Sequence, residues 1–362
     1  MRRVALVHDW LTDYGGAERV LLEMHALYPQ APVYTSLWKP ETLPPEFASV
    51  QIVPSFLQRL PARLRRHRLL LPLMPLAFEA FDLDDYELVL SSSHACAKGV
   101  LTGPQTLHVA YLHTPIRYAW DMFHSYVRQA GLSGWKQLLI HPLLHYLRLY
   151  DQLSSQRIDH LLCNSEFVSR RIRKYYRREA TVIYPPVDVP TQPPQRRPKD
   201  FYLVVGRHVP YKRVDLAIET FRANGRRLKI VGDGPERARL QASASKNIEF
   251  LGEVPRPELE ALYASARGLI FSPLEDFGIV PVEAQAHGCP VLAYGRGGAC
   301  ETVVAEETGL FFAEQSVASL QQALERFESL DFAPARLHAH AGKFAAARFR
   351  RQLQDYLAAL LP

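Results

Sequence analysis

The sequence has few of the features that mark a metal-bound, disulfide-linked or membrane-spanning protein. It contains only four cysteines in 362 residues, and no two of them form a C-x-x-C pair. This spacing argues against a zinc site or a disulfide framework and favours the cytoplasm as the compartment. The longest apolar run, residues 69–78, is about half the length that a bilayer crossing requires. The N-terminal apolar run ends at His8 and Asp9 without a small-residue cleavage site, so we expect a first strand there and no membrane span.

Two nucleotide-binding motifs are also missing. Neither G-x-G-x-x-G nor a P-loop occurs, and GRGG at 295–298 does not match G-x-G-x-x-G. The main sequence evidence for a dinucleotide oxidoreductase or an ATPase is therefore absent. The acidic stretch FDLDDYE has carboxylates at Asp82, Asp84 and Asp85, a spacing that could hold a metal. It comes just before an expected strand, where acidic residues usually form a solvated turn. We therefore expect no metal.

The composition is that of a globular protein with a basic excess. Apolar residues make up 48% and charged residues 22%, and the length suits two α/β domains of similar size. The formal net charge of +6 favours partners that carry phosphate, such as nucleotide diphosphates, anionic lipids or nucleic acid. Nucleic acid is the weakest of these, because the basic clusters lack interleaved aromatic residues apart from Tyr175 and Tyr176. We expect no nucleic-acid partner.

Short β-branched runs alternate with helical patterns along the whole chain, which predicts parallel sheets covered on both faces. The pattern breaks at the proline-rich stretch 186–200, the expected linker. The predicted fold class is therefore α/β, with doubly wound Rossmann-like domains at 1–185 and 201–340 that face each other across a cleft. Residues 341–362 are predicted to be helical. Their spacing is equally compatible with packing on the second domain and with a return to the first.

The segment LIFSPLEDFGIVPVEAQAHG is the richest in candidate functional residues. A buried strand leads into a loop with Glu275 and Gly278, and Glu283 follows inside a helix. The backbone amides of Gly278, Ile279 and Val280 would lie at the start of that helix. Such amides form a natural seat for phosphate.

A second segment, VVGRHVPYKRVDLAI, places two cations after a strand. The strand is expected to end at Gly206, with Arg207 and Lys212 before the next helix. Cations at this edge could neutralise a departing diphosphate, the arginine through its planar fork and the lysine as a point charge. Taken alone, each of these segments is equally compatible with a solvated loop or turn.

Together and in this order, the two segments resemble the C-terminal domain of retaining glycosyltransferases of family 4, which have the GT-B architecture of two Rossmann-like domains. The matching features are the Arg207 and Lys212 pair, the two glutamates with seven residues between them, and GDGP at 232–235. At the N-terminus, VHDWLTDYGGAERV resembles the glycine-rich loop of the family. His113, in VAYLHTPIRYAW, falls where the family has a histidine near the transferred sugar. SSSHACAKG followed by YLHTPIRYAW further resembles mannosyltransferases of O-antigen and exopolysaccharide assembly.

The resemblance implies a metal-independent transferase without a cofactor, which moves a hexose with retention from a nucleotide-sugar, best matched by GDP-mannose. The acceptor would be a glycan or lipid-linked glycan of a surface polysaccharide. Arg207 and Lys212 would stabilise the leaving diphosphate, Glu275 would bind the sugar and Glu283 the ribose. The implied catalytic residues are His113, Arg207, Lys212 and Glu275, and the implied donor-binding residues are Gly15, Gly16, Gly206, Gly232, Val254, Gly278, Ile279, Val280 and Glu283. The alternative is a non-catalytic GT-B subunit, against which the complete motif set argues.

A basic segment borders the apolar run of the first domain, with arginines at 59, 63, 65, 66 and 68. Two interpretations remain open. The segment either lies on an anionic membrane surface or forms a solvated basic helix beside a buried one. Family 4 enzymes often act on lipid-linked acceptors, and this favours peripheral contact of the Arg59–Arg68 region with the inner face of the cytoplasmic membrane.

Overall fold

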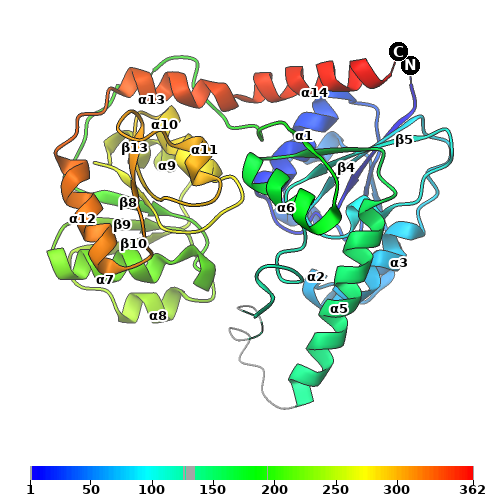
Figure 1. The fold of residues 1–362 in the computed structure, drawn as a ribbon, viewed down its shortest axis with the longest axis horizontal. Coiled ribbons are helices and arrows are strands. Elements are labelled where there is room, and N and C mark those ends of the chain that lie inside the picture. The colour runs from blue at the N-terminus through cyan, green and yellow to red at the C-terminus, as the bar shows by residue number, and fades with distance from the viewer. Residues whose placement is uncertain (1, 125–126, 128–134, 194, 362) are drawn as a thin grey trace. The chain divides into compact units, whose positions relative to one another are not determined.

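The structure is a computed structural model that describes residues 2–124, 127, 135–193 and 195–361. It divides into two compact units, one formed by Met1–Pro185 with Phe349–Pro362 and the other by Pro186–Arg348. The proline-rich segment belongs to the second unit in this division. Figure 1 shows each unit as a twisted sheet covered by helices.

The first unit contains a sheet of seven strands in the order β3-β2-β1-β4-β5-β6-β7, and all neighbouring strands are parallel. Consecutive strands run outward from β1 in one direction and from β4 in the other, so the sheet is doubly wound. The strands are β1 (Val4–His8), β2 (Val33–Thr35), β3 (Ile52–Pro54), β4 (Leu88–Ser93), β5 (Leu107–Leu112), β6 (His160–Cys163) and β7 (Thr181–Val182).

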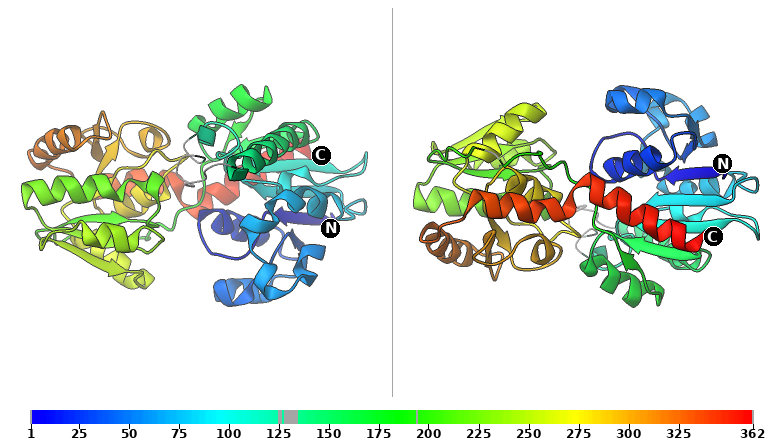
Figure 2. Two further views of the ribbon diagram at one scale, coloured as in Figure 1. Left: turned by 90° about the horizontal axis from the view of Figure 1, so that it is seen from below. Right: turned by 90° about the horizontal axis from the view of Figure 1, so that it is seen from above.

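Helices cover both faces of this sheet (Figure 2). Alternate strand residues such as Leu6 and Leu90 pack on one face with α1 and α14, and their neighbours Val7 and Val89 pack on the other with α3. Both faces are apolar because a parallel sheet between helix layers is buried on each side. The longer helices of the unit are α1 (Gly16–Leu27), α3 (Met74–Glu79), α5 (Trp135–Ser155), α6 (Glu166–Tyr176) and α14 (Ala346–Leu360).

The second unit repeats this plan with six parallel strands in the order β10-β9-β8-β11-β12-β13. Its strands are β8 (Tyr202–Val205), β9 (Leu228–Val231), β10 (Ile248–Gly252), β11 (Leu269–Phe271), β12 (Val291–Tyr294) and β13 (Gly309–Phe312). Its helices are α7 (Val214–Asn224), α8 (Arg237–Ala242), α9 (Arg256–Ser265), α10 (Ile279–Ala286), α11 (Ala299–Thr302), α12 (Val317–Glu328) and α13 (Pro334–Ala341).

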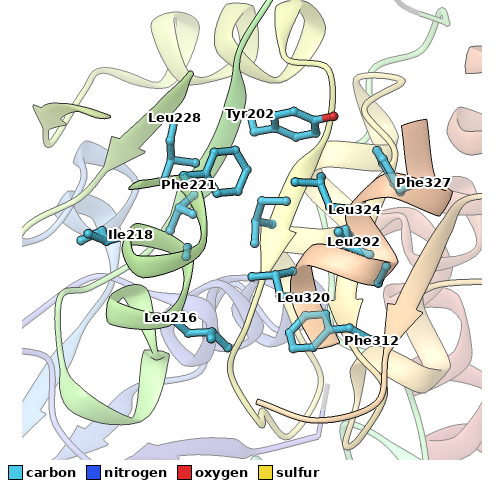
Figure 3. Packing of buried hydrophobic residues seen from close by; sticks show 14 of the residues in the cluster. Tyr202, Leu216, Ile218, Phe221, Leu228, Leu292, Phe312, Leu320, Leu324 and Phe327 are labelled. Carbon is cyan, nitrogen blue, oxygen red and sulfur yellow. The ribbon is translucent and has the colours of Figure 1, made fainter. Parts of the chain in front are cut away.

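The larger core of the second unit lies under α7 and α12. Phe221 of α7 and Leu324 of α12 pack with the strand residues Tyr202 and Leu292, as Figure 3 shows. All four side chains are at most 2% exposed. This core holds the sheet rigid behind the loops that leave the carboxyl ends of its strands.

The C-terminal segment consists of two helices with a short turn between them. Helix α13 ends at Ala341, a short 3-10 turn follows at Gly342–Phe344, and α14 begins at Ala346. The Phe344 ring contacts Phe277 of the second unit. Phe349 contacts Tyr111 of the first unit, and Arg350 forms an ion pair with Glu23 of α1. The break therefore lets the two halves of the segment pack in different units.

The basic segment is not a continuous helix either, and this corrects the second of its two sequence interpretations. Residues 56–79 form a chain of short turns and helices, with α2 (His67–Leu70) and α3 separated by a 3-10 turn at Leu71–Leu73. Pro72 and Pro75 limit each piece to a few residues. In the described ranges, no helix is long and apolar enough to cross a membrane.

His108 is a buried polar residue on β5 of the first unit. Its Nε2 lies 2.9 Å from Ser91 Oγ, and burial lowers the pKa of His108 to about 4. Its backbone amide donates to Asp159. In the unfolded chain the imidazole titrates near 6.5, so the unfolded state takes up the proton first as the pH falls.

We predict that the stability of the first unit falls as the pH drops from about 6.5 to about 4, and that His108→Gln removes the His108 part of this dependence while buried His113 retains its own. The His108 contribution between pH 7 and pH 5 is roughly 2 kcal/mol. Urea unfolding at the two pH values measures it, with the exposed His145→Gln on α5 as the control. An equal pH dependence in the two variants would contradict the assignment.

Candidate active site

The second unit has its candidate site where the order of its strands reverses. Strands β8 and β11 are neighbours, and the chain continues from them toward opposite edges of the sheet. A crevice at the carboxyl ends of such a pair is where open α/β sheets bind ligands. A small pocket lies there, lined by Val204, Val205, Gly206, Lys212, Arg213, Val214, Ile270, Phe271, Ser272 and Pro273.

Lys212 and Glu275 meet across this crevice. The Lys212 ammonium donates to Glu275 Oε1, and the two side chains are 18% and 17% exposed. Lys212 comes from the 3-10 turn after β8 and Glu275 from the loop after β11. An ion pair with little solvent around it is screened less than one on the open surface, so it holds both groups in place. Arg207 follows Gly206 in the same loop and is exposed.

The loop that carries Glu275 rests on two glycines. Gly298 donates its amide to the Glu275 carbonyl oxygen at 2.8 Å, and a β-carbon at Gly298 would lie 2.6 Å from the Asp276 carbonyl oxygen. At Gly297, where φ is +75°, a β-carbon would lie 2.6 Å from the Glu275 carbonyl oxygen. Only glycine fits this close backbone approach. The GRGG sequence, set aside as a nucleotide motif, thus fixes the position of the glutamate loop.

Two further glycines join the loops after β8 and β9. A β-carbon at Gly232 would collide with the Gly206 carbonyl, and one at Gly234 would lie 2.5 Å from the His208 carbonyl oxygen. His208 donates its backbone amide to the Asp233 carbonyl at 2.7 Å. Its ring is fully buried, and burial lowers the pKa of His208. The GDGP sequence therefore packs tightly against the loop that carries Arg207.

The amide seat expected from the sequence lies at the start of α10. Gly278 is the residue before the helix and has φ of +89°, a conformation that glycine adopts most readily. Ile279 and Val280 are the first two residues of α10 and are partly exposed. Amides in a first helical turn have no partner within the helix. Val254 lies in the loop between β10 and α9 and is also partly exposed.

Glu283 lies apart from the Lys212 pair and is 5% exposed on α10. Its Oε1 is 3.2 Å from Arg256 Nη1, and its Oε2 accepts a hydrogen bond from the Tyr263 hydroxyl at 3.3 Å. Burial raises the pKa of Tyr263, and the adjacent Glu283 charge raises it further. The two glutamates thus differ in their surroundings: Glu275 pairs with an ammonium in the crevice, and Glu283 is held by a tyrosine and an arginine.

The first unit gathers polar residues at its own reversal point, between β1 and β4. Ser92 Oγ lies 3.2 Å from His8 Nδ1 and 2.8 Å from His113 Nε2, and His8 Nε2 lies 3.3 Å from Glu18 Oε1. His8 Nδ1 and His113 Nε2 thus lie within hydrogen-bond distance of one serine hydroxyl, which can donate to only one of them.

Burial lowers the pKa of His113, and nearby His94 and His8 lower it further. The imidazole is therefore neutral near pH 7, the form in which Nδ1 can accept a proton or a hydrogen bond. Asn164 donates to the His113 carbonyl at 2.9 Å and so fixes the backbone as well.

Asp9 follows β1 directly and holds the loop at residues 94–97 in place. Its buried carboxylate accepts four backbone hydrogen bonds of 2.6 to 2.9 Å from His94, Ala95, Cys96 and Ala97. Burial alone would raise the pKa of Asp9, but His94, His8 and these amides lower it. A carboxylate with four donors is stable as an anion even when buried.

The glycine-rich loop is closed by its own helix. The Gly15 amide donates to Glu18 Oε2 at 2.8 Å, and Gly16 is the first residue of α1. Glu18 thus bridges this loop to His8. The Gly15 amide already donates to Glu18, so Gly15 contributes to the site only through the shape of the loop.

The structure brings most of the predicted residues to the carboxyl ends of their strands, in two separate sets. Lys212 and Glu275 are paired in the second unit, whereas His113 belongs to the first. Further residues form the site without having been predicted from the sequence, namely Asp9, Ser92 and the GRGG glycines. The available signal for Asp9 was a polar residue directly after a buried strand, whereas Ser92 lies inside β4 and gave no such signal. A glycine pair gives no signal of which loop it supports.

The acidic FDLDDYE stretch forms a local turn. Asp82 accepts from the Asp84 amide at 3.2 Å, and Asp85 lies 3.4 Å from Arg3. Within the described part of the chain, no group of three or more His, Cys, Asp or Glu side chains is placed to hold a metal ion.

Comparison with known proteins agrees with the two-unit structure. A family model described as Glycosyltransferase Family 4 matches residues 14–190, and one described as Glycosyl transferases group 1 matches residues 190–346. The GDP-mannose-dependent alpha-mannosyltransferase of Mycobacterium tuberculosis is 41% identical over 29% of this chain and 28% of its own length. The O-antigen chain mannosyltransferase RfbU of Salmonella typhimurium is 25% identical over 59% of this chain and 63% of its own length.

The chain thus spans less than two thirds of either relative. Among solved structures, HepE of Anabaena in complex with UDP and glucose has a TM-score of 0.71 at 18% identity and covers 99% of this chain and all of its own.

Two doubly wound units in this order have the GT-B fold. The chain belongs to the glycosyltransferases of family 4, because the two family models together cover residues 14–346. The sequence predictions of two Rossmann-like domains and of this family are confirmed.

Gly297 offers a direct test of the packing behind Glu275. We predict that Gly297→Ala destabilises the second unit clearly more than Gly225→Ala. Both glycines have φ near +74°, at +75° and +73°, but no atom lies within 4 Å of a β-carbon at Gly225. Gly225→Ala should therefore cost only the backbone strain, about 1 to 2 kcal/mol. Thermal unfolding measures both variants, and equal losses would show that the contact with Glu275 is unimportant.

Proposed function

We propose that this enzyme transfers a hexose, with mannose from GDP-mannose as the best match, to a glycan or lipid-linked glycan in surface polysaccharide synthesis. The observation that carries the proposal is the Lys212 and Glu275 pair at the strand reversal of the second unit. Mannose and GDP are supported by the printed names of two relatives, a GDP-mannose-dependent mannosyltransferase and an O-antigen chain mannosyltransferase.

In the proposed reaction, Lys212 and the exposed Arg207 stabilise the diphosphate that leaves the donor sugar. Negative charge grows on the leaving oxygen as the glycosidic bond breaks, so cations already in place stabilise the transition state more than the ground state. The amides of Gly278, Ile279 and Val280 add donors at the start of α10, and the loop shapes at Gly206, Gly232 and Val254 accommodate the nucleotide.

The two glutamates bind the donor at separate points in this proposal. Glu275 accepts hydrogen bonds from hydroxyl groups of the sugar, and its ion pair with Lys212 keeps it oriented. Glu283 accepts ribose hydroxyls, and Tyr263 and Arg256 hold its carboxylate in position. Neither glutamate acts as a nucleophile: transfer with retention takes place by attack on the face from which the diphosphate departs. No metal or cofactor takes part.

His113 contributes from the first unit as a neutral imidazole beside the reacting sugar. In this proposal Ser92 accepts from His113 Nε2, so that Nδ1 of His113 is the acceptor for a hydroxyl group. Gly15 and Gly16 shape the loop that ends in this network.

The transfer assay tests the function and the site together. We predict that purified protein releases GDP from GDP-mannose, and that Lys212→Ala or Glu275→Ala lowers turnover by about 10²- to 10³-fold while the fold survives. Lys229→Ala is the matched control, because Lys229 pairs with Glu249 at 3.2 Å on neighbouring strands β9 and β10. Unchanged turnover in either site variant would remove the site assignment. Donor binding without any turnover would instead favour the non-catalytic alternative.

We also propose that the enzyme works in the cytoplasm as a peripheral protein on the inner membrane face. The first unit exposes large apolar side chains beside exposed Arg59 and Arg63. These apolar residues are Phe56 (46%), Leu64 (44%), Leu69 (62%), Leu73 (43%) and Leu76 (55%). Apolar side chains next to arginines suit an anionic bilayer surface.

For this membrane contact, we predict that Leu73→Ser with Leu76→Ser weakens binding to phosphatidylglycerol vesicles by about tenfold or more, since each leucine loses its favourable burial. Co-sedimentation with the vesicles measures the change. Leu101→Ser, at a leucine that is 47% exposed outside this segment, is the control. Equal binding of all three proteins would reject the contact.

A further inference from the structure

The first unit contains an open cavity of about 380 Å³ that has charged side chains in its lining and that the donor site does not use. It opens where the chain leaves β1 and β2 at their carboxyl ends. Its lining comes from the loop after β1, the loop after β2 and the start of α2, and consists of Thr12, Asp13, Lys39, Arg65, Arg66, His67 and Leu69. The cavity is large enough for a diphosphate with part of a sugar.

The charges in this cavity are unbalanced. Lys39, Arg65 and Arg66 contribute three cations against the single carboxylate of Asp13. Among the residues that the structure describes, none of these three cations forms an ion pair. Arg65 Nε is buried and has no hydrogen-bond partner in that part of the chain. A buried donor without an acceptor is costly, so the cavity is set up for an anion that completes it.

The rim of the cavity is apolar on one side. Leu69 lines the cavity and is 62% exposed, and it belongs to the same run as Leu73 and Leu76. Asp13 is also exposed and can accept hydroxyl groups. Phosphate-binding cations, a hydroxyl acceptor and an apolar rim together match a ligand that has a phosphate between a sugar and an alkyl chain.

Trp10 connects this cavity to the histidine network. Its ring stacks on His67 with centroids 4.8 Å apart and an angle of 7° between the planes. Its edge contacts His94 at 4.5 Å, and the ring of His94 lies 6.2 Å from that of His113. A ligand with its phosphate near His67 would thus extend its sugar along Trp10 toward His113.

We propose that this cavity is the acceptor's anion subsite, and that the acceptor is a glycan linked to a lipid through a phosphate or diphosphate. The inference rests on the proposed function, of which it specifies the acceptor class. Arg65 and Arg66 bind the phosphate oxygens, Lys39 adds charge, and Leu69 contacts the first part of the lipid chain. Arginine forks are well matched to phosphate oxygens. Arg65 and Arg66 line the cavity and Arg59 and Arg63 do not, so the two pairs have different roles.

The test measures binding of inorganic pyrophosphate by calorimetry in the Arg207→Ala, Lys212→Ala protein, in which the donor site no longer competes for the probe. We expect Arg65→Gln with Arg66→Gln to weaken pyrophosphate binding by about tenfold or more. Arg59→Gln with Arg63→Gln removes the same charge from neighbouring exposed positions and should leave the affinity within about twofold. Circular dichroism checks that both pairs remain folded.

Phosphatidylglycerol vesicles separate an acceptor phosphate from a bilayer headgroup. Loss of pyrophosphate affinity in the Arg65 and Arg66 pair alone supports the subsite. Unchanged affinity in that pair, or an equal loss in both pairs, overturns it. Loss of vesicle binding without loss of pyrophosphate binding also overturns it, because the two arginines would then serve a headgroup. The measurement needs no donor and no transfer, so it can succeed or fail independently of the GDP-mannose assay.

Discussion

Both units depend on one constraint, the reversal of strand order in a parallel sheet. At β1 and β4, and again at β8 and β11, neighbouring strands send the chain in opposite directions, and no crossover helix covers their carboxyl ends. Loops from distant parts of the sequence must meet there. The Lys212 and Glu275 pair is one result, and the contact of Asp9 with the amides of residues 94–97 is the other.

These loops are held by two different means. In the second unit, glycines allow backbone to lie directly on backbone, as at Gly298 against Glu275. In the first unit, buried charges do the same work. Lys98 is 1% exposed and donates to Asp151 at 2.5 Å, and Asp151 also accepts from Trp120 and Tyr176. A buried ion pair is tolerated when further hydrogen bonds complete it.

The sequence was sufficient to predict the α/β class, the two-domain plan and the family, because strand and helix periods and the spacing of the glutamates are local features. Nothing local could reveal that Glu283 is enclosed by Tyr263 and Arg256, which come from another helix. The histidine network could not be predicted for the same reason. In the sequence Ser92 cannot be distinguished from any other strand serine, and only the fold places His8 and His113 beside it. The role of the basic segment was predicted from its composition alone. In the structure, prolines divide the segment into short pieces, and two of its arginines line a cavity.

The placement of α14 has a consequence for the order of events during synthesis. Phe349, Leu353 and Leu357 complete the core of the first unit, yet they are translated only after the whole of the second unit. The second unit is contiguous and can finish folding earlier, although its synthesis begins later. Domains usually fold in the order of translation. Here the first unit must wait, with an apolar strip over α1 and β5 uncovered, until the second unit has been translated.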